Sequence, residues 1–196
     1  MTPQTYIFIG RSGCGKGTQA ALLEKILREK TDNHIAHLET GKLFRDFFNG
    51  ATITQEMAQT IYNNGLLQPE FLTVHLWSDF LVMNMKKETT LIIDGTPRRQ
   101  NEALVLHTAF EFYHRDSAHV IYINVPRESS HQRMVERKRE DDTERDIELR
   151  LNWFDTEVLP AIEYYRKNPF YKVHEINGER PIEEVHADIV KTLGLG

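Results

Sequence analysis

The chain has 196 residues, of which 40% are hydrophobic and 27% charged, and its net charge of −5 argues against a large nucleic-acid surface. This length predicts one soluble domain with a sizeable core, and the single cysteine excludes an internal disulfide and a cysteine zinc site. Because no apolar run reaches signal-peptide or membrane-spanning length, we expect a cytoplasmic protein without membrane contact.

The first predicted strand, residues 6–9, leads into a glycine-rich segment at residues 10–19 and a helix over residues 17–30. Glycine permits a tight turn and lets a phosphate approach the backbone, while the N–H groups at a helix start favour an anion. Lys16 adds a positive charge, Thr18 offers a hydroxyl to Mg²⁺, and the spacing is a Walker A pattern. We predict a nucleotide-phosphate site here rather than a glycine turn that binds nothing. Cys14 is interpreted as a small loop residue rather than a nucleophile.

The remaining chain alternates between strands and helices. Strands are expected at residues 34–38, 90–94, 119–125 and 171–176, and helices at 43–48, 55–63, 70–85, 128–139 and 147–166. We expect Pro160 to kink the last of these helices, and a final helix to begin at Pro181. This order predicts an α/β fold of the P-loop NTPase type, with three layers and a five-stranded parallel sheet flanked by helices. The consecutive helices between residues 43 and 86 indicate a small helical insertion.

Asp94 ends a buried apolar strand beside the predicted phosphate loop. An aspartate at this edge of a parallel sheet is suited to hold Mg²⁺ through water. The alternative is an aspartate that only caps the next helix.

Six arginines follow the predicted carboxyl ends of strands, where the topology brings them to one rim with Lys16. Because arginine forms bidentate contacts with phosphate, an acidic chain that gathers arginines there needs an anionic ligand. This arrangement favours a phosphotransferase whose acceptor is itself a phosphate over a hydrolase, since no residue is an obvious candidate to position an attacking water. The six are Arg45, Arg98, Arg133, Arg137, Arg139 and Arg150.

The chain resembles the adenylate kinases and the wider nucleoside monophosphate kinase family, in the form with a short lid. The motifs that carry the resemblance cover residues 13–19, 40–45, 65–67, 94–98, 125–137, 141–150 and 178–181. It implies a single P-loop kinase domain over residues 1–196, with a monophosphate-binding subdomain at residues 40–69 and a lid at residues 138–144. The lid has neither room nor cysteines for a zinc-binding insert, so we expect no structural zinc, and the family likeness favours a monomer.

The resemblance also implies roles for individual residues. ATP would be bound by Gly13, Cys14, Gly15, Lys16, Gly17, Thr18, Arg133, Arg137 and Arg180. The acceptor nucleotide would be bound by Thr40, Arg45, Leu66, Gln68, Gly95, Arg98, Glu102, Arg139 and Arg150. Catalysis would fall to Lys16, Arg98, Arg137, Arg139 and Arg150, and Mg²⁺ would be held by Thr18 and Asp94, partly through water.

The implied reaction is ATP + AMP ⇌ 2 ADP with Mg²⁺, but the predicted base site departs from the family pattern. Glu102 stands where adenylate kinases commonly have a glutamine, and an ionised carboxylate accepts hydrogen bonds but donates none. It would suit the amino group of adenine or cytosine and the edge donors of guanine. Thr40 favours AMP, and CMP, UMP and GMP remain alternatives. A catalytically inactive nucleotide sensor is the alternative from another class of function.

Overall fold

The computed structural model describes residues 2–137 and 143–196. Its centre is an all-parallel five-stranded sheet with strand order β2-β3-β1-β4-β5. The predicted α/β class, the parallel sheet and its five strands are therefore confirmed. The strands are β1 (Thr5–Ile9), β2 (His34–Glu39), β3 (Thr89–Asp94), β4 (Ala118–Asn124) and β5 (Tyr171–Asn177).

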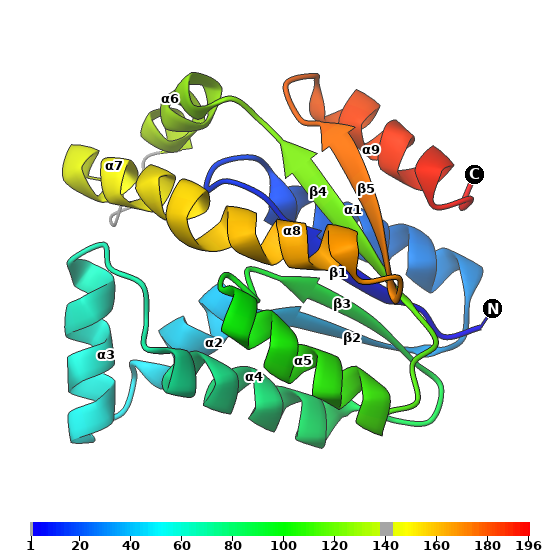
Figure 1. Cartoon of the computed structure of the whole chain (residues 1–196), viewed down its shortest axis with the longest axis horizontal. Coiled ribbons are helices and arrows are strands. Elements are labelled where there is room, and N and C mark those ends of the chain that lie inside the picture. Colours follow the sequence, from blue (N-terminus) through cyan, green and yellow to red (C-terminus); the bar gives the residue numbers. More distant parts are fainter. Residues whose placement is uncertain (1, 138–142) are drawn as a thin grey trace.

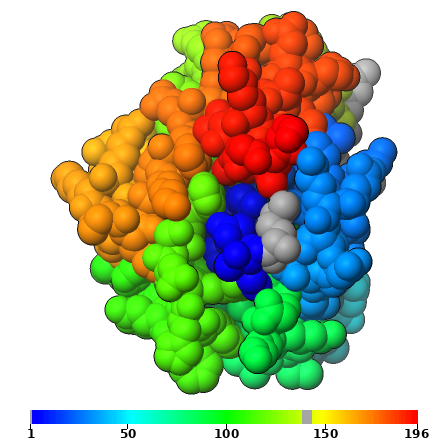
Figure 2. Space-filling view, turned by 90° about the vertical axis from the view of Figure 1, so that its right-hand side faces the viewer, coloured from blue at the N-terminus to red at the C-terminus, as the bar shows by residue number. Residues whose placement is uncertain are grey.

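Helices cover both faces of the sheet, which makes the predicted three layers. Figure 1 shows α5 and α8 crossing in front of the sheet, and both chain ends lie at the edge away from the arrowheads, the face seen in Figure 2. Among the described residues, no helix combines the length and apolarity needed to cross a bilayer. The helices are α1 (Lys16–Lys30), α2 (Thr40–Phe47), α3 (Ile53–Asn63), α4 (Glu70–Asn84), α5 (Gln100–Phe112), α6 (Arg127–Arg137), α7 (Glu144–Trp153), the π-helical turn η1 (Phe154–Val158), α8 (Leu159–Lys167) and α9 (Ile182–Thr192).

The core lies on both faces because successive strand residues point to opposite sides. In β1, Ile7 packs into the cluster under α4, α5 and α8, whereas its neighbour Phe8 packs under α1 and α9. Every residue of β1 is buried. This explains why the central strands appear in the sequence as continuous apolar runs, as is typical of a parallel sheet covered on both sides.

The segment between β2 and β3 packs around a small core of its own. Phe44 of α2, Ala58 of α3 and Leu72 of α4 form a cluster separate from the two sheet cores. The start of α3 is fixed by a capping box, in which Thr52 and Gln55 satisfy each other's backbone N–H groups. The local core supports the predicted helical insertion, whose boundaries at residues 40–69 remain a prediction.

The expected single helix over residues 147–166 is wrong in its start and in the place of its irregularity. Helix α7 begins at Glu144, and the regular pattern is interrupted at η1, before Pro160. There the N–H of Leu159 donates to the carbonyl of Phe154, five residues back. Because proline has no N–H and its ring crowds the carbonyl four residues earlier, a wider turn just before it accommodates the ring, and Pro160 itself lies in the first turn of α8.

Candidate active site

A cleft of about 780 Å³ opens at the carboxyl edge of the sheet. Its walls come from the loop after β1, the start of α2, the loop after β3, and helices α6 and α7. Ligands of open α/β sheets bind at this edge. The cleft is therefore the candidate active site.

The phosphate loop, residues 10–15, joins β1 to α1 in a shape that favours glycine at three positions, the first of which is Gly10 with φ 150°. Gly13 has φ 83° and Gly15, which caps α1, has φ 98°. Gly10 passes so close to β4 that an added Cβ would lie 2.5 Å from the carbonyl oxygen of Ile123. Lys16 folds back over the loop, where its Nζ donates to the carbonyls of Gly10 at 2.9 Å and Arg11 at 2.8 Å. The loop backbone and one lysine thus converge on a single concavity.

Asp94 and Thr18 are the residues predicted to hold Mg²⁺, and both line the cleft. Burial raises the pKa of Asp94, and the nearby Lys16 ammonium opposes that effect. Gly17, in the first turn of α1, leaves room for the Asp94 carboxylate, since an added Cβ at this position would lie only 3.2 Å from Asp94 Oδ2. A carboxylate and a hydroxyl are the hard oxygen donors that Mg²⁺ prefers, and a divalent cation would offset the cost of ionising a buried acid. The donor set therefore fits the metal.

The predicted acceptor loop, residues 95–99, is braced by a buried carboxylate from the first turn of α5. Glu102 is 2% exposed, and its Oε2 accepts hydrogen bonds from the N–H of Arg98 at 2.9 Å and the hydroxyl of Thr96 at 3.4 Å. Burial raises the pKa of Glu102, against the opposing bond from Arg98. Arg98 Nε donates to the carbonyl of Gly95 at 3.0 Å. Glu102 lines the cleft, but its Oε2 is already used in hydrogen bonds that fix the conformation of the loop.

Arg99 is a site residue that the sequence interpretation missed. Its Nη1 donates to the carbonyl of Gln68 at 2.9 Å, and its Nε donates to Glu157 of η1 at 3.1 Å. Glu102 Oε1 lies 3.7 Å from the same guanidinium. Arg99 therefore joins the end of the helical insertion, the acceptor loop and the π-helical turn. The one sequence signal was a second arginine directly after Arg98.

Two polar atoms at the cleft are buried without a partner among the residues that the structure describes. They are the hydroxyl of Thr40 and Oε1 of Gln68. Gln68 is held in place by its Nε2, which donates to the carbonyl of Ala58 at 2.8 Å. A buried unpaired acceptor costs free energy unless a ligand supplies the missing hydrogen bond. Both atoms are thus suited to contact a bound nucleotide.

Most residues predicted for the site come together at this cleft. Cys14 is an exception, because its side chain is 3% exposed and packs in the core cluster under α1 and α9. Arg180 is outside the lining and pairs with Asp188 of α9. Arg139, and residues 138–142 of the predicted lid, fall outside the described residues. The lining includes Gly13, Gly15, Lys16, Gly17, Thr18, Thr40, Arg45, Leu66, Gln68, Asp94, Gly95, Arg98, Glu102, Arg133, Arg137 and Arg150.

Comparison with known proteins agrees with this geometry. A family model described as adenylate kinase matches residues 8–170. The chain belongs to the adenylate kinase family. Similar relatives include an adenylate kinase of Thermosynechococcus vestitus, 31% identical over 96% of each chain, and adenylate kinase 1 of Nostoc sp., 32% identical over 96% of this chain and 97% of the relative. An adenylate kinase of Prochlorococcus marinus strain NATL1A is 33% identical over 96% and 97%.

Membership of the adenylate kinase family confirms the resemblance seen in the motifs, and with it the class of phosphotransferase enzymes.

One contact of the phosphate loop was not predicted from the sequence. Arg11 Nη2 bonds Asp155 of η1 at 2.9 Å, and its guanidinium lies 4.1 Å from the ring centre of Phe154. The same π-helical turn thus supplies Asp155 to the phosphate loop and Glu157 to Arg99 on the acceptor loop.

Proposed function

We propose that the protein transfers the terminal phosphoryl group of ATP reversibly to AMP, giving two molecules of ADP. One observation carries this proposal. The phosphate loop and the Arg98 loop, which follow the adjacent strands β1 and β3, line a single cleft together with arginines from α2, α6 and α7. Two phosphate chains can meet end to end in such a cleft, because the cations offset the repulsion between them.

On the donor side, the N–H groups of residues 13–18 and the ammonium of Lys16 would hold the ATP phosphates. Thr18 and Asp94 would hold Mg²⁺, which neutralises charge on the terminal phosphates when it is bound. Cys14 would contribute through its backbone only, since its side chain packs in the core. Arg180 would lie near the donor base, as the family likeness implies.

On the acceptor side, Arg45 and Arg98 would bind the monophosphate. Thr40 and Gln68 would contact the nucleoside, because each has a buried oxygen without a partner in the described part of the chain. Oε1 of Gln68 and the carboxylate of Glu102 both accept hydrogen bonds, and this suits the amino group of adenine. Leu66, 48% exposed at the cleft, offers an apolar surface to the base.

During transfer, Arg137, Arg139 and Arg150 would neutralise the moving phosphoryl group. No side chain need act as a base, since the attacking phosphate oxygen is already ionised. Residues 40–69 and 138–144 would close over the two nucleotides and exclude water. We propose that one chain is sufficient for this cycle.

The test is a coupled assay with ATP, Mg²⁺ and each of AMP, CMP, UMP and GMP in turn. The proposal expects two ADP for each AMP consumed, and little product with the other three acceptors or with no acceptor. A strong preference for CMP, UMP or GMP would overturn the AMP assignment. Binding of ATP and AMP without turnover would instead identify a nucleotide sensor.

A further inference from the structure

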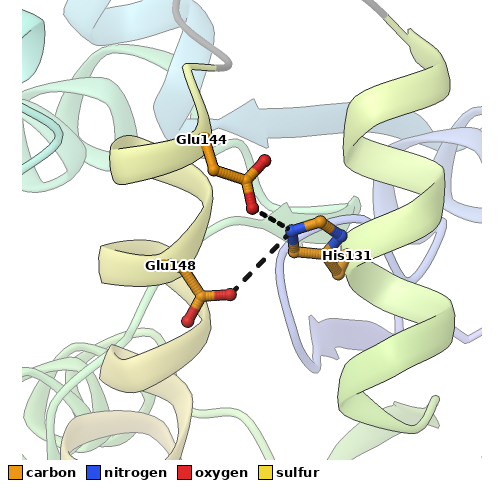
Figure 3. Close-up of side chains that lie close together, drawn as sticks. All are labelled: His131, Glu144 and Glu148. Carbon is orange, nitrogen blue, oxygen red and sulfur yellow. Dashed lines mark hydrogen bonds and ion pairs between the residues drawn. The ribbon is translucent and has the colours of Figure 1, made fainter.

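A second group of potential ligands lies outside the cleft, between α6 and α7. Figure 3 shows His131 of α6 pointing toward Glu144 and Glu148, which lie one turn apart on the facing side of α7. His131 Nε2 is 2.8 Å from Glu144 Oε1 and 3.9 Å from Glu148 Oε1. In residues 2–137 and 143–196 this is the one group of three such side chains whose ligand atoms lie within 4.8 Å of one another.

Glu148 is oriented by a residue that would not itself touch an ion. Arg127 Nη2 donates to Glu148 Oε2 at 2.6 Å and to Asn152 Oδ1 at 2.8 Å. Because Arg127 holds one carboxylate oxygen, the other oxygen, Oε1, is the one nearer His131. Hydrogen bonds of this kind to the far oxygen of a carboxylate are a regular feature of metal sites, where they orient the ligand and hold it ionised.

Two glutamates converge on one imidazole nitrogen at this position. The side chains of Glu144 and Glu148 are 72% and 48% exposed, and pairs this exposed contribute little to stability. Without a metal, Nε2–H of His131 donates to Glu144, and moving that proton to Nδ1 would turn the Nε2 lone pair toward an ion held between the two carboxylates. Ligand bonds of about 2.0–2.2 Å place donor atoms roughly 3–3.5 Å apart around one ion, and small side-chain rotations bring these three atoms to that spacing.

We propose that His131, Glu144 and Glu148 bind a divalent transition-metal ion, with water completing its coordination. Imidazole beside carboxylates suits Zn²⁺, Co²⁺ or Ni²⁺, whereas Mg²⁺ and Ca²⁺ favour sites made of oxygen alone. The ion would link α6, which carries Arg133 and Arg137, to α7, which carries Arg150. It would therefore fix the spacing of helices whose arginines line the cleft. This inference does not depend on the identity of the phosphoryl acceptor.

The test is calorimetric titration of Zn²⁺ into the chelator-treated protein without nucleotide, for the wild type, His131→Asn and His75→Asn. His75 is an exposed histidine of α4 and serves as the matched control. We expect the wild type and His75→Asn to bind one Zn²⁺ per chain at this site. His131→Asn should lose at least about tenfold in affinity or the whole binding event, and Glu144→Gln should weaken binding in the same direction.

Two further measurements, thermal melting with Zn²⁺ and competition by Mg²⁺, test the metal site independently. Zn²⁺ should raise the melting temperature of the wild type and His75→Asn but not that of His131→Asn, whose metal-free melting curve reports its folding. Mg²⁺ at the same concentration should displace no Zn²⁺. Equal Zn²⁺ affinity in the wild type and His131→Asn would overturn the site, and so would full displacement by Mg²⁺.

Discussion

The phosphate loop and the acceptor loop line one cleft but obtain their shapes differently. The phosphate loop takes its shape mainly from its own backbone, with Gly10, Gly13 and Gly15 at positive φ and Lys16 bonded to carbonyls five and six residues away. Its one distant side-chain bond described above joins Arg11 to Asp155. The acceptor loop depends on side chains, since Arg99 bonds residues 31 and 58 positions away in the chain. A loop shaped by its own backbone should tolerate side-chain substitutions nearby. A loop held by distant side chains should lose function step by step as each of those side chains is replaced.

The largest effect should follow from Arg98→Ala on the acceptor side. We expect kcat/KM for ATP and AMP to fall by about 10³-fold, because the role proposed for Arg98 is to neutralise the transferring phosphate. Stability should change little, since Glu102 accepts from the backbone N–H of residue 98, which alanine keeps. A coupled assay and a thermal melt measure the two quantities. Unchanged turnover would show that Arg98 is not part of the site. The control is Arg28→Ala, at an exposed arginine of α1 outside the cleft, which should leave turnover unchanged.

The next effect separates two glycines of the phosphate loop. Gly10→Ala should lower the free energy of unfolding by about 3 kcal/mol, since its Cβ would meet the backbone oxygen of Ile123, which cannot rotate away. Gly15→Ala should cost only about 1 kcal/mol, because its φ of 98° is strained but no atom lies within 4 Å of the added Cβ. Urea denaturation of both variants checks the difference. Equal losses would contradict a loop whose tightest point is the contact with β4.

A smaller effect is expected where the acceptor side depends on Arg99. Arg99→Met should raise KM for AMP by about tenfold and leave kcat and KM for ATP nearly unchanged, because Gln68 loses the bond that fixes its carbonyl. Glu157→Gln, which keeps a polar partner for Arg99, should show part of the same change. Steady-state kinetics with each substrate varied in turn provide the test. A fall in kcat with KM for AMP unaltered would place Arg99 outside nucleotide positioning.

The smallest expected effect is a loss of folding stability on acidification. It should affect both loops alike, because the groups that titrate lie on the sheet that carries both of them. His119 and His174 stack on β4 and β5 with their ring nitrogens 2.9 Å apart, near Tyr6 and Lys172. Burial lowers the pKa of His119 to about 4 and also lowers that of His174. Since both pKa values lie below the unfolded value of 6.5, the unfolded chain binds more protons in this window, and stability falls as pH drops from about 6.5 toward 4.

The measurement is the melting temperature between about pH 7.5 and pH 5 for the wild type and His119→Gln. The variant should lose less stability on acidification, because it lacks one of the two titrating rings. Lys42→Gln, at an exposed lysine of α2, is a suitable control. An identical acid sensitivity in the wild type and His119→Gln would show that other groups set the pH dependence.

The same contrast explains how much could be predicted from the sequence. The phosphate loop, Asp94 and the strand pattern are local features, and each was found where the residues indicated. Arg99 and Glu102 were harder to interpret, because the partners of Arg99 lie far along the chain and the bonds of Glu102 depend on the fold of the loop before α5. The turn at η1 was missed for a related reason, since proline signals an irregularity without fixing its place.

The central claim is that two phosphate chains meet end to end in one cleft. Calorimetric binding of a bisubstrate analogue, two adenosines joined by a polyphosphate chain, tests it most directly. The account predicts one analogue per chain, competition with both ATP and AMP, and much weaker binding by Arg98→Ala. Displacement of only one of the two nucleotides, or unaltered binding by Arg98→Ala, would contradict it.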